Sequence, residues 1–134
     1  VGNFKAHAGS ESHSFRLCFC PFAGATLLVT CCSREKEAKL WDLSNLPATD
    51  DALKPVATLR GHTAGITAVC SSADGTLIAT GSFDKSIKVW LTLNGRELHT
   101  LQGHVKCANG VAFNSTNSAL VSCGVERSVL LWSG

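Results

Sequence analysis

The sequence predicts an all-β protein built from repeated antiparallel sheets, and two observations support this fold class. First, landmarks recur at a fixed interval, because His62 and His104 are 42 positions apart and so are Trp90 and Trp132. Two landmarks that shift by one common interval indicate an internal repeat. Second, short apolar runs alternate with Gly, Asp, Asn and Ser turn signals, which is the pattern of short strands joined by tight turns.

The most regular copy of the repeat spans residues 61–102 and opens with a Gly-His pair. The Asn94-Gly95 pair predicts a tight turn late in the copy, because both residue types tolerate positive φ. Apolar runs on either side of the turn signals predict four strands, at 66–70, 76–82, 87–92 and 97–101.

Less regular copies lie on either side of this one. The third copy, residues 103–134, keeps the same His-to-Trp spacing. The first copy, residues 1–42, has Ala6-His7 in place of Gly-His and is six residues longer, since His7 to Trp41 is 34 positions and His62 to Trp90 is 28. We predict that one extra residue forms a β-bulge at Cys31-Cys32. The other insertions predict a polar loop at 8–14 and, within 43–60, a loop at 44–54 before a closing strand at 56–59.

The Gly-His opening, the Ser82-x-Asp84 pattern at the second turn and the run 87–90 that ends in Trp resemble the WD-repeat family of β-propellers. The resemblance implies four-stranded antiparallel blades arranged in a ring of roughly four to eight. Three copies fall short of a ring, so we expect a partial propeller of three blades within a longer six- to eight-bladed chain. Residues 3–6 resemble the last strand of a preceding blade. The alternative is that two copies of the chain join head to tail into six blades.

The resemblance also implies a structural network in each blade. In the family, an acid of the second turn, the Gly-His histidine, a hydroxyl of the second strand and the Trp of the third strand form a buried hydrogen-bonded chain. In the second copy these are Asp84, His62, Ser82 and Trp90. The first copy offers His7, Ser33, Glu35 and Trp41, and the third offers His104, Glu126 and Trp132 with the hydroxyl lost at Gly124.

Ser82, His62 and Asp84 are also the residue types of a nucleophilic triad. We interpret them as structural, because a carboxylate, an imidazole, a hydroxyl and an indole can satisfy one another when buried. No Gly-rich phosphate loop and no tuned pair of acids occurs in the sequence. The sequence therefore predicts neither an enzyme nor a cofactor.

Seven cysteines and one Asn-x-Thr pattern are the remaining candidates for chemistry. Several cysteines, including Cys70, Cys107 and Cys123, lie in apolar strand runs, so we predict small buried thiols in a reducing compartment. The first copy concentrates possible zinc ligands, but the spacing of its cysteines is poor, so we predict no metal; these residues are Cys18, Cys20, Cys31, Cys32, His7 and His13. The pattern at 114–116 matches a glycosylation acceptor, but we interpret it as a turn.

The predicted function is a non-catalytic scaffold for protein interactions within a multiprotein complex, in the cytoplasm or nucleus. One alternative is a propeller attached to, or regulating, an enzyme. Another is a nucleic-acid-associated subunit, although a formal net charge of +2 does not indicate nucleic-acid binding. The resemblance places partner proteins or peptides on the face built from the second turns and the Gly-His turns. The predicted contact residues are Phe83, Arg34, Val125, Thr63 and Lys106, with Glu11 and His13 on the polar loop.

Overall fold

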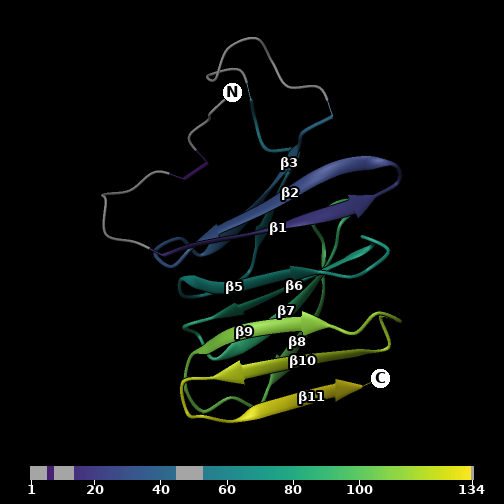
Figure 1. The fold of residues 1–134 in the computed structure, drawn as a ribbon. Helices are drawn as coiled ribbons and strands as arrows, with labels where there is room; N and C mark the ends of the chain where they lie inside the picture. Colours follow the sequence, from purple (N-terminus) through teal and green to yellow (C-terminus); the bar gives the residue numbers. More distant parts are fainter. Residues whose placement is uncertain (1–5, 8–13, 45–52, 134) are drawn as a thin grey trace.

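The computed structural model describes residues 6–7, 14–44 and 53–133, and its regular structure there consists of β-strands (Figure 1). The strands form three antiparallel sheets that follow one another along the chain. This confirms the predicted all-β fold of a partial propeller. Within the part of the chain that the structure describes, no helix is long and apolar enough to span a membrane.

The first sheet has four strands in sequence order, and each neighbouring pair is antiparallel. The strands are β1 (Phe15–Phe22), β2 (Ala25–Cys32), β3 (Glu37–Asp42) and β4 (Ala57–Arg60). The pairing of β1 with β2 runs without a register shift through Cys31 and Cys32, so the predicted β-bulge is wrong. The extra residue lies in the turn between β2 and β3, where no strand pairing is interrupted by it.

The second sheet repeats this order with the predicted strands, whose ends lie within one residue of the predicted ones. The strands are β5 (Ile66–Ser71), β6 (Leu77–Ser82), β7 (Ser86–Leu91) and β8 (Glu97–Gln102). The third sheet has the order β11-β10-β9. Its strands are β9 (Ala108–Phe113), β10 (Ala119–Gly124) and β11 (Val129–Ser133).

Each pair of neighbouring sheets buries an apolar core between them. The first core brings Leu40 and Leu59 of the first sheet against Ile78 and Trp90 of the second, all with no exposed surface. The second core joins the other face of the second sheet to Ala108 and Leu120 of the third. The sheets therefore pack side by side as blades do, with β1 against β5 and β5 against β9.

The outer faces of the first and third sheets carry large exposed apolar side chains. On the first sheet they come from β1, and on the third from β10 and β11. These outer faces are apolar, like the faces that neighbouring sheets bury against one another. The side chains are Phe15, Leu17, Phe19, Val121, Val129 and Leu131.

Several predictions on loops concern residues outside the described part. These are most of the polar loop at 8–14, including Glu11 and His13, most of the loop at 44–54, and most of the strand at 3–6. The division of the chain into repeats at 42/43, 60/61 and 102/103 stays a prediction. The Asn114 segment is a turn, as predicted, in which the Asn114 side chain binds Thr116, Ser118 and the backbone N–H of Ala119.

Candidate functional site

A buried polar network links the strands of the second sheet at the end where the Gly-His segment lies. His62 Nδ1 lies 2.7 Å from Asp84 Oδ2, and His62 Nε2 lies 2.7 Å from Thr80 Oγ1. Trp90 Nε1 donates to the same Thr80 oxygen at 2.8 Å. In the chain Asp84–His62–Thr80–Trp90, every polar side chain therefore has a hydrogen-bond partner.

The ionisation of this network follows from burial and hydrogen bonding. Burial lowers the pKa of His62, although the neighbouring Asp84 carboxylate acts in the opposite direction. Burial disfavours the charged form of Asp84, but hydrogen bonds from Ser86, His62 and the Thr63 N–H outweigh it and lower its pKa to about 2. At neutral pH a neutral His62 thus donates a hydrogen bond from Nδ1 to ionised Asp84, and its Nε2 accepts a hydrogen bond from the Thr80 hydroxyl.

These pKa shifts predict two acid-dependent losses of stability. His62 has a lower pKa when folded, so its stabilisation is complete above the unfolded value of 6.5 and declines as the pH falls below it. Asp84 shifts from 3.8 to about 2, so a further loss of about 2 kcal/mol is expected between those pH values. Denaturant titrations of the full-length protein across this pH range measure both losses. The Asp84→Asn variant should lack the second loss, and an unchanged pH profile in that variant would contradict the assignment.

The prediction that Ser82 supplies the hydroxyl of the network is wrong. Ser82 Oγ does not bind His62; it donates to the carbonyl oxygens of Ala64 and Gly65 at 3.1 and 2.9 Å. The reason is the register of β6 and β7, whose last pair is Gly81 with Ile87. Ser82 lies beyond that pair, about 7 Å further along the strand than Thr80. The same geometry means that Ser82, His62 and Asp84 are not arranged as a nucleophilic triad.

The first sheet contains the same network with a different acid. His7 Nδ1 lies 2.5 Å from Glu35 Oε2, and His7 Nε2 lies 2.9 Å from Thr30 Oγ1. Trp41 Nε1 donates to Thr30 at 2.8 Å. The prediction that Ser33 supplies this hydroxyl is therefore wrong, because Ser33, like Ser82, lies beyond the last pair of the two central strands, here Cys31 with Ala38.

The third sheet also has a hydroxyl in its network, so the predicted loss at Gly124 is wrong. Ser122 Oγ lies 2.7 Å from His104 Nε2 and accepts the Trp132 indole N–H at 2.8 Å. His104 Nδ1 binds Glu126 Oε1. Glu126 Oε2 has no partner and is a buried unpaired side-chain oxygen in the described part of the chain.

A signal for the correct hydroxyl was present in the sequence. Thr80 and Ser122 are 42 positions apart, the same interval that separates the histidines and the tryptophans. Thr30 occupies the matching position in the first sheet. A search for hydroxyls at the common interval would have found this position, whereas a search near the acidic turn found Ser82.

The five predicted partner-contact residues that the structure describes lie at the same end of the sheets as the networks. Arg34, Phe83 and Val125 stand in the turns before the network acids, and Thr63 and Lys106 follow the network histidines; all five are exposed. We call this end the turn face: residues 33–36, 61–65, 83–85, 103–107 and 125–127.

Backbone hydrogen bonds join the first two sheets at the turn face and fix turns of the second and third sheets. Ile66 N–H donates to Glu35 O at 3.0 Å, which joins the first turn to the second sheet. Phe83 N–H donates to Gly65 O at 3.0 Å, and Gly65 itself lies against the backbone of Ser33 and Arg34. The Val125 N–H donates to Cys107 O at 2.9 Å. Phe83 and Val125 are thus each held by a backbone hydrogen bond to the neighbouring turn.

The cysteines differ in burial: Cys20, Cys31 and Cys32 are buried and Cys18, Cys70 and Cys107 are half-buried, whereas Cys123 is exposed, so the prediction of a buried thiol is wrong for Cys123. Burial raises the pKa of Cys18 and Cys31 to about 12 and that of Cys70 to about 11, which keeps them protonated at neutral pH. All seven cysteines are free. Among the residues that the structure describes, no group of three or more His, Cys, Asp or Glu side chains could hold a metal ion.

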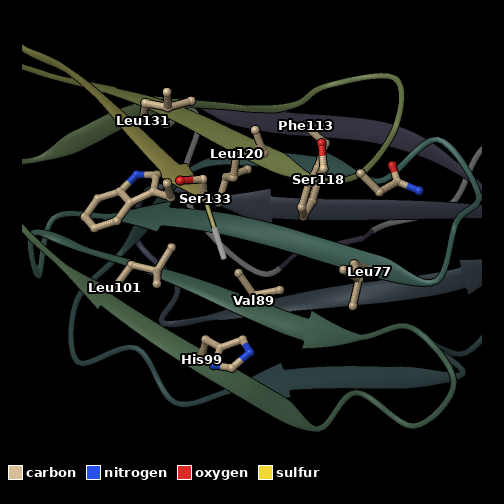
Figure 2. Close-up of a pocket in the computed structure, with 12 residues that line it drawn as sticks. Leu77, Val89, His99, Leu101, Phe113, Ser118, Leu120, Leu131 and Ser133 are labelled. Atoms are coloured by element: carbon tan, nitrogen blue, oxygen red, sulfur yellow. The ribbon is translucent and has the colours of Figure 1, made fainter.

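A cavity of about 460 Å³ lies between the second and third sheets, lined by Val89 and Leu101 on one side and Phe113 and Leu120 on the other (Figure 2). Between the first and second sheets, Leu59 occupies the position that matches Leu101, two residues before Gly-His, and it is fully buried in the core. Gly95 in the turn after β7 lies close to it. We therefore interpret the cavity as a gap in blade packing.

The three antiparallel sheets pack side by side, and each contains the same kind of buried network. This arrangement defines the protein as part of a β-propeller built from repeated blades. The family model described as "WD domain, G-beta repeat" matches residues 53–90 and 95–133. The chain belongs to the WD-repeat family.

Curated relatives support the same family. The chain is 30% identical over 139 residues to the "Probable cytosolic iron-sulfur protein assembly protein CIAO1 homolog" of Caenorhabditis elegans, covering 98% of this chain and 40% of that protein. It is 33% identical over 114 residues to "Nuclear distribution protein PAC1" of Arthroderma benhamiae, covering 79% and 23%. It is 35% identical over 98 residues to "GID complex subunit 7" of Schizosaccharomyces pombe, covering 70% and 18%. The chain thus spans less than half the length of these relatives.

Proposed function

We propose that this chain is a non-catalytic protein-interaction scaffold that docks a partner protein or peptide on its turn face, within a multiprotein complex. Support comes from the WD-repeat family to which it belongs and from the names of relatives such as "GID complex subunit 7". The proposed site of action is the cytoplasm or the nucleus, and the word "cytosolic" in another relative's name supports the cytoplasm.

The observation that carries this proposal is the exposed apolar side chain of Phe83 on a rigid turn. Phe83 is 52% exposed, although its backbone is fixed to Gly65. An exposed aromatic ring on a fixed backbone is a favourable anchor, because its burial loses little conformational entropy. Arg34 lies across the boundary between the sheets, with its backbone against the same Gly65, and supplies a charge beside the anchor.

The test is a comparison of partners captured by the full-length protein and by its Phe83→Ala, Arg34→Glu double variant. We expect the variant to lose partners that the wild type retains after affinity purification and quantitative mass spectrometry, because the central anchor and a neighbouring charge are gone. The matched control is Leu93→Ala, Arg96→Glu, which makes the same kind of change at exposed residues of the opposite end. An identical partner set for all three proteins would exclude the turn face as the docking surface.

A further inference from the structure

The described residues have an uneven distribution of exposed charge. Among the described residues, Asp74 carries the one exposed carboxylate. It lies in the turn after β5, at the end opposite the turn face. Its oxygen is already bound by the Ser72 and Thr76 hydroxyls. Exposed cations, in contrast, gather at the turn face, at Arg34, Lys36, Lys85, Lys106 and Arg127, with Arg60 next to it at the end of β4.

The histidine networks explain why acids are missing from the surface of the turn face. Each second turn contains an acid, but Glu35, Asp84 and Glu126 turn inward to His7, His62 and His104. The Asp84 and Glu126 side chains are only 10% and 11% exposed. Glu37, at the start of β3, is paired with Arg60 at 2.7 Å. The carboxylates of this end are therefore already occupied.

The cations beside those acids point outward instead. Lys36, Lys85 and Arg127 each follow directly after a network acid, and all three are exposed. None of them, nor Lys106, forms an ion pair with a carboxylate in the part of the chain that the structure describes. Four solvated cations thus recur across the three sheets without a neighbouring exposed acid.

Apolar side chains alternate with these cations. Phe83 and Val125 each stand two residues before a cation of the same turn, and Val105 directly precedes Lys106. All three are more than half exposed, at 52%, 53% and 67%. A partner that matches this surface needs negative charges spaced between apolar side chains.

We propose that the turn face recognises an acidic protein segment, rich in Asp and Glu and carrying at least one large apolar residue that covers Phe83. This inference rests on the proposed docking function of the same face and adds the chemistry of the partner. Lys85, Lys106 and Arg127 supply the complementary charge, and Lys36 and Arg34 extend it across the boundary with the first sheet.

A protein segment fits this face better than nucleic acid does. Sequence-tolerant binding of single strands depends on aromatic rings on which successive bases stack. Here Phe83 is the sole exposed aromatic side chain on the described part of the turn face, since His62 and His104 are buried. Its exposed apolar companions Val105 and Val125 offer no ring. The formal net charge of +2 is also small for a phosphate-binding surface.

The experiment is a selection of random dodecapeptides, displayed on phage, against the immobilised full-length protein. We expect enriched peptides to be acidic and to contain a large apolar residue. A labelled peptide from the selection should bind at least about tenfold more weakly to the Lys85→Glu, Arg127→Glu variant by fluorescence anisotropy, and raised salt should weaken its binding to the wild type. The single variant Lys106→Glu repeats the test should the double variant fail to fold, which thermal unfolding reports.

The matched control is Lys54→Glu, Arg96→Glu, which reverses two exposed cations at the opposite end and should leave peptide binding unchanged. Neutral or basic selected peptides, no enrichment, or equal loss in the control would each overturn the inference. So would displacement of the peptide by oligothymidine at lower concentration than by unlabelled peptide, which would indicate nucleic acid. Loss of cellular partners in the Phe83, Arg34 variant without acidic enrichment would preserve the docking function and reject the acidic partner alone.

Discussion

We expect the substitution Thr80→Val to lower the free energy of unfolding of the full-length protein by about 2 to 4 kcal/mol. Valine has nearly the same shape as threonine, so the change removes the hydroxyl without leaving a cavity. Thr80 has no exposed surface, and its oxygen is shared by His62 and Trp90. Its loss leaves a buried indole N–H and a buried imidazole nitrogen without partners, and each costs about 1 to 3 kcal/mol.

The comparison that makes this result specific is Thr63→Val. Thr63 is one residue after His62 and exposed, and its own contact with Asp84 comes from the backbone N–H, which the substitution keeps. We expect a change within about 0.5 kcal/mol for it in the same denaturant titration. Equal effects of the two substitutions would show that Thr80 does not complete the network.

Gly75→Ala should destabilise the protein by about 3 kcal/mol or more, because two costs coincide. Gly75 has a φ of +74°, in the left-handed region that disfavours a side chain. A Cβ at this position would also lie 1.9 Å from the carbonyl oxygen of Pro21 in the first sheet, which is backbone and cannot rotate away. Cys20 Sγ donates to Gly75 O at 3.3 Å, so the required shift also breaks a contact between the sheets.

Gly24→Ala separates the two costs. Gly24 has almost the same backbone conformation, with a φ of +78°, but nothing lies within 4 Å of its added Cβ. It should therefore show only the conformational cost, about 1 to 2 kcal/mol. Chemical denaturation of both variants measures the difference, which reports the close approach of the first two sheets. Equal destabilisation of both would mean that the sheets do not meet tightly at Gly75.

The acid and the two ring-bearing residues of each network were predictable because they carry strong local signals. His62 follows the Gly of a Gly-His pair, Asp84 stands in a turn and Trp90 ends an apolar run. The hydroxyl was not predictable by its distance along the chain from the acid, because β6 carries both Thr80 and Ser82. Only the strand register decides which of Thr80 and Ser82 lies diagonally across from Trp90.

The surface chemistry of the turn face was predictable only in part. The sequence shows Phe83 and Val125 next to acids, which indicated apolar contact residues at the turns. It also shows an acidic residue directly followed by a basic one in each second turn, so the formal charges of each turn's pair sum to zero. In the folded chain the histidines draw Glu35, Asp84 and Glu126 inward.

By itself, the sequence determined the repeat, the strand positions of the second copy and the membership of each blade in a common pattern, because periodic apolar runs and turn residues are local properties. The tertiary structure showed that Thr30, Thr80 and Ser122, rather than Ser33 and Ser82, complete the networks. It alone decided that cations rather than acids are exposed on the turn face. Both outcomes depend on which side chains from distant segments meet in a buried space, and pairing register and burial set that geometry.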